Sequence, residues 1–151
     1  MEVWQSALRE VCGLSSLLWL ALQDKKHLEV SRWSLVVSSM VLLIAGCFSA
    51  VSWQWRVGGM AFGVILLLFV FFSKEALGVA DGVIIVVCGI AFGLYETVLC
   101  CFLATVYTCG YALFLLLRKK AGRKTRIPFL PFYLLGYITL RVAQSLLGRF
   151  G

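Results

Sequence analysis

The chain has 151 residues, of which 62% are hydrophobic, and its mean hydropathy is +0.96. Soluble domains use about 45–50% apolar residues, so a soluble core of this size could not bury so many apolar side chains. The formal net charge of +7 would by itself suggest a nucleic-acid partner, but the basic residues gather between the apolar runs. We therefore expect an all-α polytopic membrane protein with no nucleic-acid partner, a bundle of about six transmembrane helices that forms one membrane-embedded domain over residues 1–151.

The first two apolar runs predict the first two membrane spans. Residues 3–22 form the first span, which ends in the polar stretch 23–32. The second span is expected from Trp33 to about Val51. Because tryptophan is enriched at membrane interfaces, Trp53 and Trp55 are expected to follow this span at the interface.

The third span is expected over residues 57–72, where glycines allow helices to approach closely. The short loop 73–76 leads to a fourth span, which contains Asp81 and ends near Gly93. Residues 95–96 are expected to form a short turn.

The last two spans flank the most basic segment of the chain. Residues 97–117 have the length of about 20 residues that a bilayer requires. Six bases lie within the following loop, 118–126, and residues 127–147 form the sixth span. Pro128 is expected in the first turn of that helix, where a missing N–H costs no hydrogen bond.

The charge distribution predicts the topology. Ten of the fourteen Lys and Arg residues fall in the three loops 23–32, 73–76 and 118–126, which alternate consistently with the spans. Cytoplasmic loops are enriched in these residues, so the three loops are expected inside and both termini outside.

Two carboxylates stand out in this topology. Asp81 lies at the mouth of an apolar run, where an ionisable group is a functional hypothesis by default. Asp24 closes the first helix on the same side, because two helices intervene between the two aspartates. The other acidic residues are expected at the outer side or in loops beside basic residues: Glu2, Glu10, Glu29, Glu75 and Glu96.

A pair of aspartates at one depth can activate water. Like charges a few ångströms apart cannot both ionise, so one carboxyl stays protonated while the other is charged. The charged group can then take a proton from water, and the neutral group can polarise a peptide carbonyl. The small residues Gly78, Ala80 and Gly82 would let a substrate backbone approach.

Two other interpretations remain open at this point. Asp24 alone can be a solvated loop residue beside Lys25 and Lys26. Asp81 alone can cap a helix, or serve as the proton or cation site of a small carrier. Neither the six cysteines nor His27 shows the spacing of a metal or redox site, so no metal and no cofactor is expected.

Three motifs resemble those of the type IV prepilin peptidases, a family of membrane aspartyl proteases that includes the preflagellin peptidases. Residues 78–81, Gly-Val-Ala-Asp, resemble the G-x-G-D motif, with Ala80 in place of the second glycine. Residues 24–30 resemble the first aspartate motif, and residues 127–132, Ile-Pro-Phe-Leu-Pro-Phe, resemble the segment that opens the last helix. The sequence departs from the family pattern at Ser31 and Val83, where proline and lysine are common.

The resemblance implies a peptidase-only form, because the cysteine-bearing domain of the bifunctional members does not accompany these motifs. It implies an aspartic-type endopeptidase in the cytoplasmic (inner) membrane, with Asp24 and Asp81 as catalytic pair and no cofactor. The substrates would be pilin-like precursors of type IV pilus or protein-secretion systems, whose short basic leader peptides are cut at the cytoplasmic face. Membrane lipid is the other expected partner, and the oligomeric state is left open. The alternative is a non-enzymatic membrane protein, either a carrier or a structural subunit with a decayed active site.

Overall fold

The computed structural model describes residues 2–27, 32–47, 51–73, 79–118 and 128–150. All regular elements in these ranges are α-helices, which confirms the predicted all-α class. The six helices are α1 (Glu2–His27), α2 (Arg32–Cys47), α3 (Trp53–Ser73), α4 (Val79–Phe92), α5 (Leu94–Leu117) and α6 (Leu130–Phe150).

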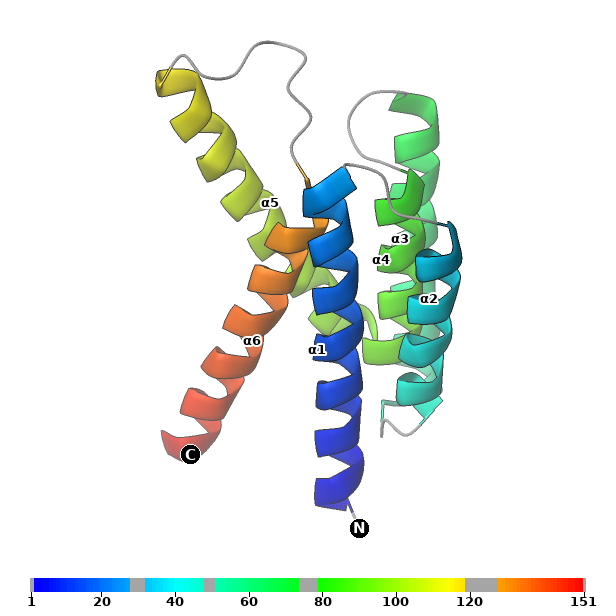
Figure 1. Ribbon diagram of the computed structural model, residues 1–151. Coiled ribbons are helices and arrows are strands. Elements are labelled where there is room, and N and C mark those ends of the chain that lie inside the picture. Colours follow the sequence, from blue (N-terminus) through cyan, green and yellow to red (C-terminus); the bar gives the residue numbers. More distant parts are fainter. Residues whose placement is uncertain (1, 28–31, 48–50, 74–78, 119–127, 151) are drawn as a thin grey trace.

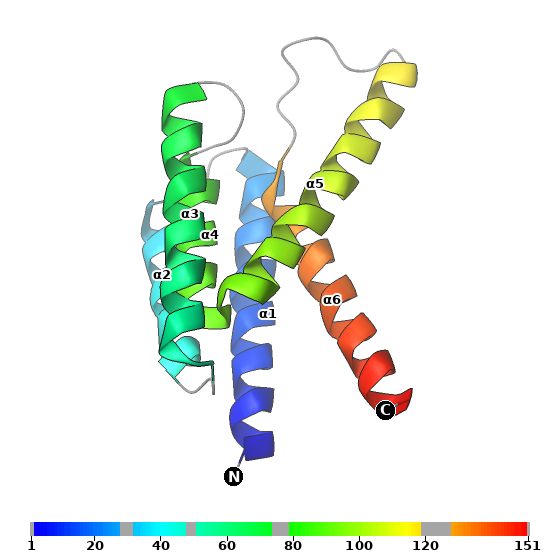
Figure 2. The same cartoon turned by 180° about the vertical axis from the view of Figure 1, so that it is seen from behind.

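The helices form a bundle with α4 at its centre (Figures 1 and 2). α4 packs against α2, α3 and α5, while α1 packs against α2 and α6. α5 and α6 also pack together and then splay apart on one side of the bundle. Five helices contribute fully buried side chains to one core, which includes Leu17, Leu20, Leu42, Ile84, Cys88, Cys100, Tyr133 and Tyr137.

A single residue separates α4 from α5, so the prediction of a turn at residues 95–96 is wrong. Gly93 has φ +86°, in the left-handed region that glycine adopts without a steric penalty. This one residue reverses the chain, and α5 begins at Leu94, which places Tyr95 and Glu96 inside its first turn.

Other helix ends also differ from expectation. α1 continues to His27, so the prediction that the first span ends at Leu22 and that the polar loop begins at residue 23 is wrong. Val51 is not helical, and α3 begins at Trp53, so Trp53 and Trp55 belong to the start of α3. α6 begins at Leu130, because the carbonyl of Phe129 is the acceptor for the N–H groups of its first turn. The proline in that first turn is therefore Pro131, not Pro128. Either proline is compatible with the first turn of a helix, because the N–H groups of that turn have no partner within the helix and proline has no N–H to leave unpaired.

The contact between α3 and α4 depends on glycine. A Cβ atom at Gly59 would collide with the backbone of Gly89, and one at Gly63 would lie 2.5 Å from the Cα of Val86. The absence of side chains therefore lets the two backbones touch. Such small-residue contacts are the usual way in which helices associate in membranes, where van der Waals packing replaces the hydrophobic effect. The result is that α4 is held firmly along α3.

Two helices have the length and composition of membrane spans, Trp53–Phe72 and Leu94–Leu117, each with a hydropathy of 2.0. Only 17% of each apolar window is buried inside the protein. A core helix of a soluble protein would hide these side chains, so their outward position favours a membrane environment. The apolar helices at Trp33–Cys47 and Val79–Phe92 are shorter than the roughly 20 residues of a typical span. Among the described residues, two of the six helices thus have the length and composition of a membrane span, and the prediction of six spans is not confirmed.

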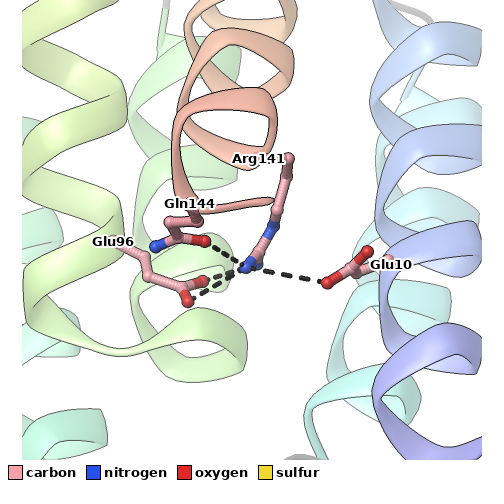
Figure 3. A network of polar contacts seen from close by, with 4 residues as sticks. All are labelled: Glu10, Glu96, Arg141 and Gln144. Atoms are coloured by element: carbon pink, nitrogen blue, oxygen red, sulfur yellow. Dashed lines mark hydrogen bonds and ion pairs between the residues drawn. The ribbon is translucent and has the colours of Figure 1, made fainter. Parts of the chain in front are cut away.

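A charged cluster links α6 to α5 and α1 (Figure 3). The Arg141 guanidinium donates two hydrogen bonds to the Glu96 carboxylate, at 2.6 and 3.2 Å, and a third to Gln144 Oε1 at 3.0 Å. Glu10 of α1 lies farther away, 3.9 Å from Arg141 Nη1. Two parallel hydrogen bonds give an arginine–carboxylate pair both strength and a fixed geometry. The cluster therefore fixes α6 against α5.

The glycine contact leads to a stability prediction. We expect Gly59→Ala to lower the free energy of unfolding by about 1–3 kcal/mol, because the added methyl group must push two backbones apart. Gly110→Ala is the matched control, since nothing lies within 4 Å of its Cβ position. That change should stabilise the protein slightly, because alanine favours helix more than glycine does. Thermal unfolding in detergent, followed by tryptophan fluorescence, would measure both, and equal unfolding temperatures would contradict the prediction.

The charged cluster leads to a second stability prediction. The side chains of Arg141 and Glu96 are 13% and 17% exposed, whereas that of Glu10 is 44% exposed. We expect Glu96→Gln to cost about 1–3 kcal/mol, because it leaves a largely buried guanidinium without its charged partner. Glu10→Gln should cost less than about 1 kcal/mol, as exposed ion pairs do. Denaturant unfolding of the two variants should rank them in this order, and the reverse order would show that Glu96 is not the main partner.

Candidate active site

Asp24 lies in the last turn of α1 and is 8% exposed. Its Oδ2 atom accepts a hydrogen bond from the backbone N–H of Leu130, at 3.3 Å. The two residues are 106 positions apart in the sequence, so this contact exists only through the tertiary fold. The solvated-loop interpretation of Asp24 is therefore wrong, because the packing of α6 against α1 removes this side chain from solvent.

Leu130 can donate this bond because it is the first residue of α6. The first N–H groups of a helix have no partner within the helix, and their dipoles favour a negative charge nearby. Phe129 and Leu130 are both buried, at 8% and 2% exposed, which anchors the start of α6 in the core. The carboxylate of one helix thus accepts a hydrogen bond from the first turn of another.

The Asp24 carboxyl lies beyond Leu22, the residue at which the first span was expected to end. Two opposing effects act on its pKa. Burial raises its pKa above the usual value, because the charged form loses solvation. The hydrogen bond from Leu130 lowers the pKa, but by less, so the net direction is upward. A carboxyl with a raised pKa exchanges its proton closer to neutral pH, as acid–base catalysis requires.

Asp81 lies in the first turn of α4 and is 9% exposed. It sits near the positive end of the α4 dipole. The position of Asp81 is set by α4, and the glycine contacts hold α4 along α3. Asp81 is therefore carried by the most closely packed pair of helices.

The two aspartates come from the same end of the bundle. The carboxyl end of α1 and the amino ends of α4 and α6 all lie toward the top of Figure 1, and Figure 2 agrees. Within the described ranges, α1 and α4 do not form a close backbone pair; α1 packs on α2 and α6 instead. The two helices meet through side chains, since the Phe92 ring lies against Gly13. A shared cleft open to the cytoplasm stays a prediction.

The small residues around Asp81 differ in their surroundings. Gly78 lies outside the described residues, and Ala80 is half-buried. Gly82 is buried and faces α3, because a Cβ atom there would lie 2.6 Å from the Leu67 side chain. The structure thus gives Gly82 a packing reason of its own. The role of all three in substrate approach stays a prediction.

A cavity of about 430 Å³ lies at the other end of α4, around the turn at Gly93. It includes Glu96 and is lined further by Val51, Ser52, Trp55, Phe92, Leu94 and Tyr95. The aspartate pair does not line this cavity. No three His, Cys, Asp or Glu side chains come together for a metal ion in the part of the chain that the structure describes. Asp24 and Asp81 therefore remain the candidate reactive groups.

Sequence reasoning missed the contact between Asp24 and the start of α6. The signal that could have found it is the segment Phe129-Leu130-Pro131, a helix start that follows the most basic loop. It also missed Arg141, which lies within the mainly apolar helix α6 and whose charge needs a partner there.

Comparison with known proteins identifies the family. A sequence model of the type IV leader peptidase family matches residues 11–115, more than two thirds of the chain. The match includes both Asp24 and Asp81 and ends before α6. No curated protein and no solved structure matches the chain. The resemblance inferred from the three motifs is confirmed: this chain belongs to the type IV leader peptidase family.

Proposed function

We propose that this protein is a membrane aspartyl endopeptidase that removes short basic leader peptides from pilin-like precursors. Membership of a leader peptidase family supports the protease activity and the general class of substrate. The observation that carries the aspartic mechanism is the placement of Asp24 and Asp81, both about nine-tenths buried, at one end of the bundle.

In this mechanism the two carboxyls share the work of peptide hydrolysis. The ionised aspartate takes a proton from water, and the water oxygen attacks the scissile carbonyl carbon. The protonated aspartate donates to the carbonyl oxygen as it gains negative charge. The tetrahedral intermediate then collapses and the C–N bond breaks. The leaving nitrogen takes the proton that the first aspartate removed from water, and a hydroxyl of the intermediate returns a proton to the second aspartate as the new carboxyl group forms. This division of roles requires one carboxyl to stay protonated while the other is charged, and burial shifts the pKa of Asp24 in the direction that favours its protonated form.

Both aspartates have local features that support these roles. Asp24 is buried, which raises its pKa, while the N–H of Leu130 gives its anion one fixed partner. Asp81 has the favourable end of the α4 dipole. The roles of acid and base can fall either way, because coupled carboxyls titrate as a pair.

We further propose that all six helices lie in the inner membrane, with the aspartate pair at the cytoplasmic face. The family and the two long apolar helices indicate a membrane protein. The basic loops favour the cytoplasmic side for the end of the bundle that carries the pair. These loops would also attract the anionic lipid of that leaflet.

The topology can be tested by cysteine labelling. In a variant that lacks the exposed Cys47 and Cys109, a membrane-impermeant thiol reagent should reach Ser52→Cys and Tyr95→Cys in intact cells. Gly122→Cys, in the basic loop, should react only after permeabilisation, because that loop is expected inside. Labelling of Gly122→Cys in intact cells would reverse the proposed orientation.

The catalytic pair can be tested by substitution with asparagine, which keeps the shape and removes the ionisable proton. We expect Asp24→Asn and Asp81→Asn each to lower cleavage of a pilin-like precursor by about 10²–10⁴-fold. The double variant should be no slower than the singles, because residues that act as one unit are not additive. Cleavage would be followed by the size shift of the precursor in membranes.

Glu10→Gln is the matched control, since it removes an exposed carboxylate outside the pair. It should cleave at the normal rate. A single aspartate variant with near-normal cleavage would remove that residue from the mechanism. Ion-linked transport that depends on Asp81 and survives loss of Asp24 would instead favour the carrier interpretation.

A further inference from the structure

The first turn of α6 supplies a backbone donor to Asp24, and the family match does not extend to this helix. We infer that the Leu130 N–H is a positioning group that orients the Asp24 carboxylate for catalysis. This inference rests on the proposed function, since it assigns a role to α6 in the same site.

The N–H of Leu130 is held in place by the packing of α6. Leu130, Tyr133 and Tyr137 are almost fully buried and fix one face of the helix in the core. Farther along, the Arg141 pair with Glu96 ties α6 to α5. A backbone N–H held in this way does not have to reorganise when charge develops, which is what makes fixed dipoles effective in active sites.

The contact also limits the freedom of Asp24. A carboxylate at the end of a helix can rotate about two side-chain torsions, and one hydrogen bond at 3.3 Å restricts which oxygen points toward the site. Oδ2 accepts the hydrogen bond from Leu130, so among the described residues Oδ1 is the oxygen that we assign to a water or a substrate. The expected consequence is that α6 selects the reactive oxygen of Asp24.

A purely structural role for the contact makes a different prediction. If the contact only completes the hydrogen bonding of the α6 start, loss of the N–H should lower stability and leave the pH profile of cleavage unchanged. If the N–H positions and stabilises the anion, its loss should raise the pKa of Asp24. The other charged or titratable groups that the structure describes toward this end of the bundle are Asp81 in the first turn of α4, Tyr133 near the start of α6 and Arg118 at the end of α5.

The sharpest test replaces the Leu130 amide by an ester, using leucic acid introduced by cell-free translation into lipid vesicles. This change removes the N–H and keeps the leucine side chain. Leu130→Pro is a second variant without the N–H, since the first helical position accepts proline. The matched control is the same ester at Leu135, an exposed residue of α6, which removes a helical N–H other than the donor to Asp24.

Two measurements are made on each variant: the pH profile of kcat/KM for precursor cleavage, and the titration of a ¹³C-labelled Asp24 carboxyl by NMR. We expect the ester to raise the pKa of Asp24 by about one pH unit, which is the effect of one charge-assisted hydrogen bond. The limb of the pH profile that depends on the ionisation of Asp24 should move upward by the same amount. The maximal rate should fall about tenfold. The Leu135 ester should lower the unfolding temperature without moving the profile.

The outcomes separate this inference from the proposed function. An ester variant with an unchanged titration, or with a shifted titration and an unchanged profile, overturns the positioning role. A wild-type protein that cleaves no precursor overturns the proposed function and, with it, the catalytic role of the contact. In that case the NMR titration still decides whether the N–H stabilises the Asp24 anion.

Discussion

Backbone contact between α3 and α4 is the constraint on which the arrangement of the site depends. Where Gly59 meets Gly89, no side chain separates the helices, so α4 cannot shift without losing van der Waals contact along its length. In an apolar environment there is little hydrophobic drive to bring helices together, and close packing has to supply the stability. Asp81 stands in the first turn of this helix, and its position is therefore set by steric fit.

Asp24 is held in a different way. α1 packs on α2 and α6 rather than closely on α4, and its aspartate is fixed by a hydrogen bond from the start of α6. One aspartate thus depends on glycine packing and the other on a helix terminus. α6 is in turn fixed by its buried tyrosines and by the pair between Arg141 and Glu96. The polar contacts of α6 bear on the site even though that helix lies outside the family match.

The differences in helix ends have a common cause. The sequence around Gly93 shows a glycine followed by the polar Glu96, and polarity favoured a turn at residues 95–96. The fold instead provides Arg141 as a partner for Glu96, so the charge can lie within a helix. At α6 both Pro128 and Pro131 fit a helix start, and the choice depends on Phe129, whose burial and carbonyl bonds set the first turn. In both places a tertiary contact decided between local alternatives that the sequence allows.

Composition and the spacing of apolar runs were enough to predict an all-α chain of six helices, because these properties depend on residue type and order alone. The motifs around Asp24 and Asp81 were likewise enough to predict the family. The contacts of each carboxylate required the tertiary structure. A hydrogen bond between residues 106 positions apart has no local signature, and neither does the meeting of Arg141 with Glu96. Which groups meet in space depends on how helices pack, and packing is set by the shapes of many side chains at once.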